Sequence, residues 1–150
     1  MRGLPMDAVE AEQYLAMQAA LGDAVTDSWH GYAVEHRGDA RVIGDIGVYL
    51  DATVEATGDV GFQFRPDYHR RGYAYEAMVA FLPWVFGTLG LRRVTARCAP
   101  ANTASWGLMQ RLGMSEVAQP PDATARCYEL LQQSWRRRDQ VCPDAQSTGQ

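Results

Sequence analysis

The sequence of 150 residues contains no lysine, and all 14 of its basic residues are arginine. A Walker-type phosphate loop needs a lysine, so this absence excludes that class of nucleotide-binding protein. It also excludes reactions in which a lysine amine of the protein forms a Schiff base with a substrate. A phosphate-binding loop in this chain would therefore work through backbone N–H groups and arginine, without lysine.

Long apolar runs and paired cysteines are also missing. No apolar stretch reaches the length of a membrane span, and the segment MRGLPMDAVEAEQ has no apolar core of the signal-peptide kind. The three cysteines, Cys98, Cys127 and Cys142, are odd in number and lack metal-ligand spacing. We therefore expect a reduced, cytoplasmic protein without a metal.

Length and composition favour one domain that can bury a core. The chain has the size of one domain, and with 47% hydrophobic residues it needs no disulfide support. The final segment, DQVCPDAQSTGQ, is polar and lacks periodicity. We predict a single domain over residues 1–138 and a disordered tail over residues 139–150.

Charge is distributed unevenly along the chain. Residues 1–60 hold 3 arginines and 11 acidic residues, residues 61–100 hold 6 and 2, and residues 101–150 hold five of each. A short arginine-rich stretch beside an acidic half fits one anionic ligand bound at one place. It argues against a nucleic-acid binder, which needs a broad basic face. Chance clustering on a solvated surface is the alternative.

Hydrophobic periodicity predicts one helix and then three strands in the first half of the chain. A helix over residues 7–21 starts at Asp7, which can form a capping box with Glu10. Three alternating segments predict strands at 32–36, 41–50 and 58–64. Their short connections permit an antiparallel meander.

The apolar period changes after residue 71. Residues 72–87 are apolar on nearly all sides, which predicts a buried helix. Pro83 lies inside this helix and should kink or end it. A strand over residues 92–99 follows and is stopped by Pro100.

The last third of the chain is less regular. Asn102 opens a helix that Gly113 follows, and residues 114–118 could add a strand. The segment 125–138 fits either a strand at 127–131 before a helical turn, or a helix throughout. The whole pattern predicts a mixed α/β domain of the layered α+β type.

The most informative segment, YHRRGYA (residues 68–74), joins a predicted strand to the buried helix. Such a junction presents free backbone N–H groups and the positive end of the helix dipole. Gly72 permits close approach of a ligand or a positive φ, and Arg70 and Arg71 add forked cationic donors. The segment can therefore cradle a diphosphate, although a solvent-facing basic turn would have the same composition.

The order of these features resembles the GNAT superfamily of N-acetyltransferases. The pyrophosphate loop of that family has the form Q/R-x-x-G-x-G/A, and here His69, Gly72 and Ala74 occupy its three defined positions. The text RRGYAYEA, then FGTLGLRRVTARCAPANTAS, then RLGM looks like the RimJ/RimL branch, which acetylates protein N-termini and many small amines. The resemblance covers residues 30–118 and implies a GNAT-like, mainly antiparallel central sheet with helices on both faces.

The resemblance also implies an acetyl-CoA site where strands at 60–65 and 93–99 splay apart. The implied pantetheine contacts are Phe62, Gln63 and Phe64, and the implied pyrophosphate contacts are His69, Arg70, Arg71, Gly72, Tyr73 and Ala74. The exposed backbone of the first strand would pair with the pantetheine amides as an added strand does. Asn102 would contact the cofactor arm, but its role as the N-cap that bonds the N–H of Ser105 is a sufficient reason for it.

The implied reaction is direct attack of an amine on a thioester, which requires an ammonium group of pKa about 10 to lose a proton. Asp59 is the candidate base, at a position where the family often has Glu, and its shorter side chain favours a water relay. A simple turn residue beside Gly58 is an equal alternative. Ser105 and Tyr128 are candidate acids for the departing thiolate, and a first-turn serine and a half-buried strand tyrosine are their plain alternatives.

Other titratable residues are weaker candidates. Asp45 is a further carboxylate, and Glu76 more simply complements the dipole of its helix. His30 and His36 have no partner that the sequence reveals.

The chain departs from the RimJ/RimL pattern at both ends of the resemblance. That branch usually begins with another strand and helix, whereas this sequence starts near what would be the second helix, and its segment after Ala118 is short. Both parts normally shape the acceptor pocket. The pocket could be wide, a partner chain could complete it, or the fold could serve another purpose.

We therefore expect an acetyl-CoA-dependent N-acetyltransferase that acts on a cationic small molecule or a peptide N-terminus. We expect a homodimer, because an unpaired sheet edge invites a partner, and neither nucleic acid nor a membrane as a ligand. The alternative is a repurposed GNAT-fold protein, either a non-catalytic dimeric binding module or a biosynthetic-pathway enzyme with other chemistry.

Overall fold

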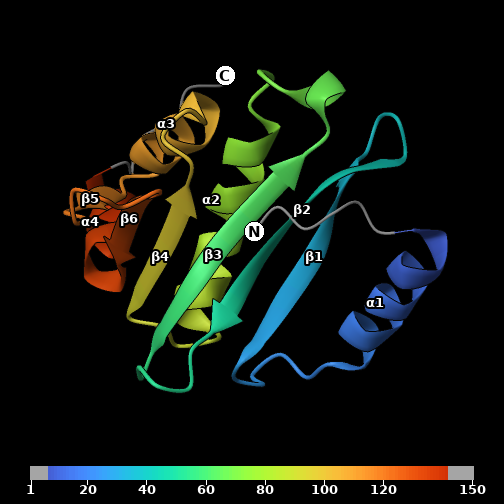
Figure 1. Ribbon diagram of the computed structural model, residues 1–150, viewed down its shortest axis with the longest axis horizontal. Helices are drawn as coiled ribbons and strands as arrows, with labels where there is room; N and C mark the ends of the chain where they lie inside the picture. Colours follow the sequence, from blue (N-terminus) through green and yellow to red (C-terminus); the bar gives the residue numbers. More distant parts are fainter. Residues whose placement is uncertain (1–6, 142–150) are drawn as a thin grey trace, which may run out of the picture.

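The computed structural model describes residues 7–141, which form a six-stranded sheet with helices packed against it (Figure 1). In chain order the elements are α1 (Ala8–Ala20), β1 (Ser28–His36), β2 (Arg41–Leu50), β3 (Thr57–Phe64), the short 3-10 helix η1 (Pro66–Tyr68), α2 (Tyr73–Gly87), β4 (Arg93–Cys98), α3 (Thr103–Arg111), β5 (Ser115–Val117), β6 (Arg126–Leu131) and α4 (Gln132–Val141). The strand order is β1-β2-β3-β4-β6-β5, and only the β3–β4 pair is parallel. The predicted fold class and the antiparallel meander are confirmed.

The hydrophobic core lies between the sheet and α2, which runs behind β3 and β4 in Figure 1. Strand residues alternate, so that Val48 and its register partner Val60 both point toward the helix. The buried residues of α2 are Met78, Phe81, Leu82, Val85 and Phe86. Burial of such a side chain stabilises a fold by about 1.5–3 kcal/mol, so this helix fixes the sheet on which the site is built.

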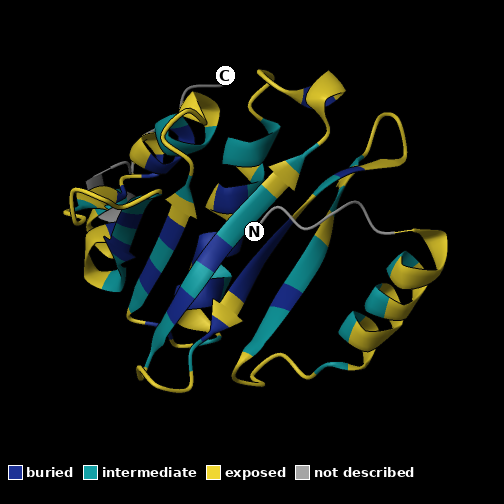
Figure 2. Ribbon diagram, viewed as in Figure 1, coloured by how far each residue is buried: buried dark blue, intermediate teal, exposed yellow. Residues whose placement is uncertain are grey.

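The first helix, α1, lies beside the edge strand β1 and is exposed on most of its surface (Figures 1 and 2). Asp7 and Glu10 form the predicted capping box. The side-chain amide of Gln18 donates to the Trp29 carbonyl (2.8 Å) and accepts from the Gly31 N–H (2.9 Å). This amide therefore pairs with the edge of β1 much as a neighbouring strand would.

Two glycines in the sheet make room for an indole ring. A Cβ on Gly47 would lie 2.5 Å from Cζ2 of Trp29, and one on Gly61 would lie 2.9 Å from its Cη2. Gly47 and Gly61 are register partners on neighbouring strands, so the ring of Trp29 lies close to the backbone of both. The face of the sheet opposite α2 is therefore shaped by close approach of a ring to backbone.

Most predicted elements match, and the differences have physical reasons. β1 starts at Ser28 rather than residue 32, because β2 is long enough to pair with it from Ser28–Leu50 onward. Pro83 does not end α2, which continues to Gly87; the proline lies on the exposed side, where water can bind the carbonyl that its ring leaves free.

The ambiguous segment 125–138 resolves as a strand followed by a helix. α4 extends to Val141, beyond residue 139 where we predicted the tail to begin, and the rest of that tail lies outside the described residues. Among residues 7–141, no helix combines the length and the apolarity that a membrane crossing requires.

Candidate active site

The β3–β4 pair diverges in the middle of the sheet. Its register pairs are Thr57–Arg93, Gly58–Val94 and Asp59–Thr95. Beyond them β3 continues to Phe64 and β4 to Cys98, with no further pair between the two strands in the described part of the chain. Figure 1 shows the strands separating toward their carboxyl ends. Backbone groups of β3 on this side are free to pair with an extended ligand.

The three residues predicted to contact pantetheine lie on the diverging part of β3. Phe62 and Phe64 are half-buried against the core, whereas Gln63 is exposed on the face opposite α2. On its other side, β3 stays paired with β2 as far as Gly44–Phe64. The strand is thus rigid on one edge and open on the other.

A tight loop, residues 65–72, connects this strand to α2; we call it the phosphate loop. The N–H of Arg65 donates to the Ile43 carbonyl (2.8 Å), and the ring of His69 donates to the Phe64 carbonyl (2.8 Å). His69 therefore braces the loop against the end of β3. Arg70 (φ 61°) and Gly72 (φ 82°) both adopt left-handed backbone, which is costly for the arginine.

The phosphate loop ends at an uncapped helix. Gly72 is the N-cap of α2 and has no side chain that could bond its first-turn N–H groups. Those groups, including the N–H groups of Tyr73 and Ala74, carry the positive end of the helix dipole. Arg70 and Arg71 are exposed beside them. The arrangement can bind a diphosphate through backbone and arginine alone.

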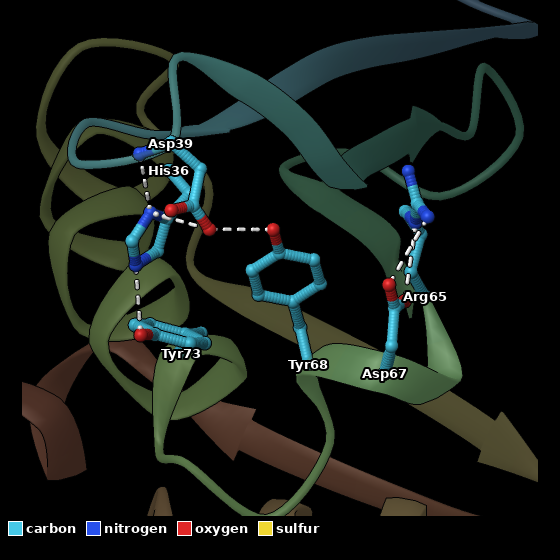
Figure 3. Close-up of polar contacts among 6 residues, drawn as sticks. All are labelled: His36, Asp39, Arg65, Asp67, Tyr68 and Tyr73. Carbon is cyan, nitrogen blue, oxygen red and sulfur yellow. Dashed lines mark hydrogen bonds and ion pairs between the residues drawn. The ribbon is translucent and has the colours of Figure 1, made fainter.

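Four side chains link the turn between β1 and β2 to the phosphate loop (Figure 3). The hydroxyl of Tyr68 donates to Oδ2 of Asp39 (2.6 Å), and Nε2 of His36 lies 2.8 Å from the hydroxyl oxygen of Tyr73. The hydrogen bond from Tyr68 is the main reason that the pKa of Asp39 lies below its ordinary value. The same bond raises the pKa of Tyr68.

Asp59, the predicted base, lies at the point of divergence. Its Oδ1 accepts a hydrogen bond from the Thr95 hydroxyl, and its Oδ2 lies 3.7 Å from a terminal nitrogen of Arg97. The carboxylate is about a third exposed (37%), so water and ligand can reach it. Asp59 therefore lies within β3 and has two side-chain partners, whereas the alternative interpretation from the sequence placed it in a turn beside Gly58.

The start of α3 contains the next two predicted residues. Asn102 accepts a hydrogen bond from the N–H of Ser105 (3.2 Å), so the predicted cap is present. Ser105 is half-buried in the first turn of α3, which packs against β4. The indole of Trp106 donates to the Pro100 carbonyl (3.2 Å) and fixes the connection between β4 and α3.

Tyr128 is more deeply buried than the sequence indicated. The residue has no exposed surface, and its hydroxyl has no hydrogen-bond partner among the described residues. It lies opposite Ala96 of β4, on the core side of the sheet. A buried hydroxyl without a hydrogen-bond partner costs free energy, so this group lowers the stability of the fold as described.

The remaining titratable candidates are distributed over the sheet. Partial burial raises the pKa of Asp45, which lies opposite Gln63 on β2. Glu76 lies in the first turn of α2. His30 is buried, and its Nε2 donates to the Val25 carbonyl (2.7 Å), so its role is structural. The part of the chain that the structure describes holds no group of three or more His, Cys, Asp or Glu suited to a metal.

Sequence reasoning missed several neighbours of the predicted residues. Thr95 and Arg97 alternate along β4 toward Asp59, but no local signal marks them, because they are 36 or more positions away. His36 has a partner after all in Tyr73. Asp39 lies in a turn, and aspartate is so common in turns that its presence there gave no sign of a further role.

Comparison with known proteins agrees with this geometry. The family described as acetyltransferase (GNAT) domain matches residues 1–115. The N-acetyltransferase YnaD of Bacillus subtilis (strain 168), itself uncharacterized, is 35% identical over 88 residues, which is 59% of this chain and 51% of that protein. YoaA of the same organism, also an uncharacterized N-acetyltransferase, is 28% identical over 85 residues, which is 57% of this chain and 48% of that protein. The matches therefore span about half of these relatives.

Solved structures share the fold. An acetyltransferase of the GNAT family from Bacillus anthracis superposes with a TM-score of 0.60 at 28% identity, over 69% of this chain and 66% of that one. The spermidine N-acetyltransferase of Vibrio cholerae, in a dodecameric structure, superposes with a TM-score of 0.69 at 16% identity. The superposition covers 85% of this chain and 75% of that one. At that identity the second likeness concerns the fold alone. With a family match over most of its length and a central sheet that opens beside an uncapped helix, this chain belongs to the GNAT acetyltransferase family.

Proposed function

We propose that this protein is an acetyl-CoA-dependent N-acetyltransferase in which an acceptor amine attacks the thioester directly in a ternary complex. One observation carries the proposal. The β3–β4 ladder stops at Asp59–Thr95, and the free edge of β3 leads straight into the phosphate loop and the uncapped start of α2. This edge fits the amides of a pantetheine arm, and the loop fits a diphosphate.

The residues of this cleft divide the work of holding the cofactor. The backbone of Phe62, Gln63 and Phe64 would pair with the pantetheine. Arg70, Arg71 and the N–H groups that follow Gly72 would bind the pyrophosphate, while His69 braces the loop. Asn102 would reach the cofactor arm from the start of α3 and also caps that helix.

The acceptor nitrogen forms the new bond to the acyl carbon as the carbon–sulfur bond breaks. Asp59 takes the ammonium proton, directly or through water, at the point where the strands diverge. Tyr128 or Ser105 gives its proton to the departing sulfur and regains one from the acylated nitrogen, which must lose its second proton to become a neutral amide. Backbone N–H groups and fixed geometry supply most of the remaining acceleration.

The acceptor we propose is a cationic small amine or a peptide N-terminus. Residues 1–60 carry eight more acidic than basic residues, and a negative field of this kind attracts a cation. A neighbour of the same fold is named a spermidine N-acetyltransferase, which fits an amine acceptor. We further propose a homodimer, since β1 lies at the edge of the sheet and the exposed surface of α1 carries Val9, Leu15 and Met17. The proposed compartment is the cytoplasm, because the three cysteines of the sequence are odd in number and lack metal-ligand spacing.

Two measurements test this function. Acetyl-CoA at saturation should raise the melting temperature of the purified protein, and an unchanged melting temperature would overturn the proposal. Release of the CoA thiol should then depend on an added polyamine, aminoglycoside or short peptide. Binding without any amine-dependent release over that panel would instead favour the non-catalytic binding module.

A further inference from the structure

The last residue of β1 and the turn that follows it are bonded to Tyr68 and Tyr73, on either side of residues 69–72 of the phosphate loop (Figure 3). We call the Tyr68–Asp39 hydrogen bond the entry anchor and the Tyr73–His36 hydrogen bond the exit anchor. Tyr68 ends η1, and Tyr73 is the first residue of α2. The loop residues that carry positive charge and left-handed backbone lie between these two points.

The entry anchor is short and well supported. Oη of Tyr68 is 2.6 Å from Oδ2 of Asp39, and the Tyr68 side chain is buried. The guanidinium carbon of Arg71 lies 5.6 Å from the centroid of the Tyr68 ring, within the range of a cation–π contact. The ring that Asp39 holds in place therefore also positions one of the two arginines that flank the helix start.

The exit anchor has a defined direction. Nδ1 of His36 accepts the backbone N–H of Asp39 (3.0 Å), so in the neutral ring the hydrogen is on Nε2 and is donated to the Tyr73 hydroxyl. The rings of His36 and Tyr73 also meet edge to face, with centroids 5.0 Å apart. The O–H hydrogen of Tyr73 then remains free to donate, at the edge of the proposed diphosphate site.

A loop shaped in this way needs external support. Arg70 occupies the left-handed region (φ 61°), which is unfavourable for a residue with a Cβ. Fixing each further residue of a free loop would also cost backbone entropy when a ligand binds. Contacts that impose the bound shape beforehand reduce this cost and so raise affinity.

We propose that the two anchors are positioning contacts for the diphosphate of the acyl-CoA, holding the phosphate loop in its ligand-binding shape without touching the ligand's acyl group. The inference rests on the proposed function of the same cleft. It assigns a role in cofactor affinity to Asp39 and Tyr68. Both residues lie outside the loop motif, which runs from His69 to Ala74 in this sequence. His36 and Tyr73 support the same loop from its other end.

The charge of Asp39 is not what the loop needs. A carboxylate near a diphosphate repels it, whereas the hydrogen bond from Tyr68 requires only an acceptor oxygen. An asparagine provides that oxygen without the charge. The matched pair Asp39→Asn and Asp39→Ala therefore separates the acceptor from the charge.

The test measures binding of CoA by titration calorimetry to the full chain. We expect Tyr68→Phe and Asp39→Ala to raise the Kd for CoA about tenfold, and Asp39→Asn to stay within about twofold of the wild type. Tyr75→Phe is the control, because it removes another hydroxyl on α2, bonded to Arg138 (2.8 Å), away from the loop. It should leave the Kd unchanged. Equal affinity in Tyr68→Phe and wild type would overturn the inference.

A second measurement distinguishes positioning of the diphosphate from general damage. The KM for acetyl-CoA should rise in Tyr68→Phe, whereas the KM for S-acetyl-N-acetylcysteamine, a thioester without phosphates, should stay unchanged. Amide hydrogen exchange over residues 65–73 should accelerate in the same variant. If the wild type does not bind CoA, the proposed function fails and this inference with it. If the wild type binds CoA, but the KM values for both thioesters rise equally in Tyr68→Phe, this inference fails and the proposed function stands.

Discussion

The hydroxyl of Thr95 donates a hydrogen bond to the carboxylate of Asp59 at the last register pair that β3 and β4 share. The bond closes the ladder at the point where the two strands part. It also fixes the orientation of a carboxylate that is about a third exposed (37%). Thr95 is thus a positioning partner of the proposed base, and Arg97 on the same strand supplies a nearby positive charge.

Replacing Asp59 with asparagine should lower kcat about 100-fold while the KM for acetyl-CoA stays within about twofold. The amide still accepts the Thr95 hydrogen bond, so the strands keep their geometry and only the proton acceptor is lost. The deficit should shrink as pH rises, because more acceptor amine is then already deprotonated. Steady-state kinetics between pH 7 and about pH 9.5 measure both effects.

The control for this variant is Thr95→Val, which keeps the carboxylate and removes its donor. Its kcat should fall less than that of Asp59→Asn. Wild-type turnover in Asp59→Asn would show that Asp59 only closes the ladder, and the base would then have to be sought elsewhere, first at Asp45.

Removing the hydroxyl of Tyr128 should affect stability and catalysis in opposite directions. The hydroxyl is buried and has no hydrogen-bond partner within residues 7–141, so Tyr128→Phe should raise the free energy of unfolding by about 1 kcal/mol. If the hydroxyl protonates the departing sulfur, kcat should fall at least about tenfold in the same variant. Urea unfolding and steady-state kinetics on one preparation give both numbers.

Ser105→Ala serves as the comparison for Tyr128→Phe. A loss of kcat confined to Ser105→Ala would transfer the role of acid to the serine. A stability loss in Tyr128→Phe would mean that its hydroxyl has an unseen partner in the folded protein.

Gly72→Ala should weaken CoA binding about tenfold. Gly72 has φ 82°, so an alanine there costs about 1 kcal/mol and shifts the N–H groups that begin α2. Gly90→Ala is a matched control: its φ is 71°, and an added Cβ would likewise meet nothing within 4 Å. Both variants should lose similar stability in urea, but only Gly72→Ala should lose affinity in calorimetry. Equal affinity in the two would show that the conformation of Gly72 does not serve the ligand.

The periodicity of the sequence was sufficient for most elements of this fold. Alternation over residues 41–50 predicted β2 with its observed bounds, Arg41–Leu50, and the all-apolar run predicted α2 within one residue. Local signals failed where tertiary pairing decides. The segment after residue 125 forms a strand because β4 offers it a partner from Arg93–Leu131 to Cys98–Arg126.

The candidate site was predictable only where its residues are close in sequence. The phosphate loop could be identified because its glycine, its arginines and the helix start are contiguous. The anchors from Asp39 and His36 could not, because they cross 29 and 37 positions and join residue types that are ordinary in turns and strands. The complete burial of Tyr128 was missed for a similar reason, since it depends on core residues from elements distant in the sequence.

The hydrogen bond between Tyr68 and Asp39 should make part of the stability depend on pH. The folded protein holds the pKa of Asp39 below its unfolded value, so the stabilisation is present above that unfolded value, about 3.9. It is lost as pH falls through the lower pKa of the folded state. The raised pKa of Tyr68 acts in the opposite sense: its contribution is complete below about pH 10 and is lost as pH rises through the folded value.

The difference in urea midpoint between wild type and Tyr68→Phe should therefore be largest between about pH 5 and pH 9 and shrink on both sides. Using the difference cancels every other titrating group that the two proteins share. Carbon-13 titration of the Asp39 carboxyl should show its pKa rising toward the ordinary value in Tyr68→Phe. A hydrogen bond to the ionised carboxylate must weaken once Asp39 is protonated. A difference in midpoint that stays constant down to pH 3 would therefore show that the hydroxyl of Tyr68 does not stabilise the ionised form of Asp39.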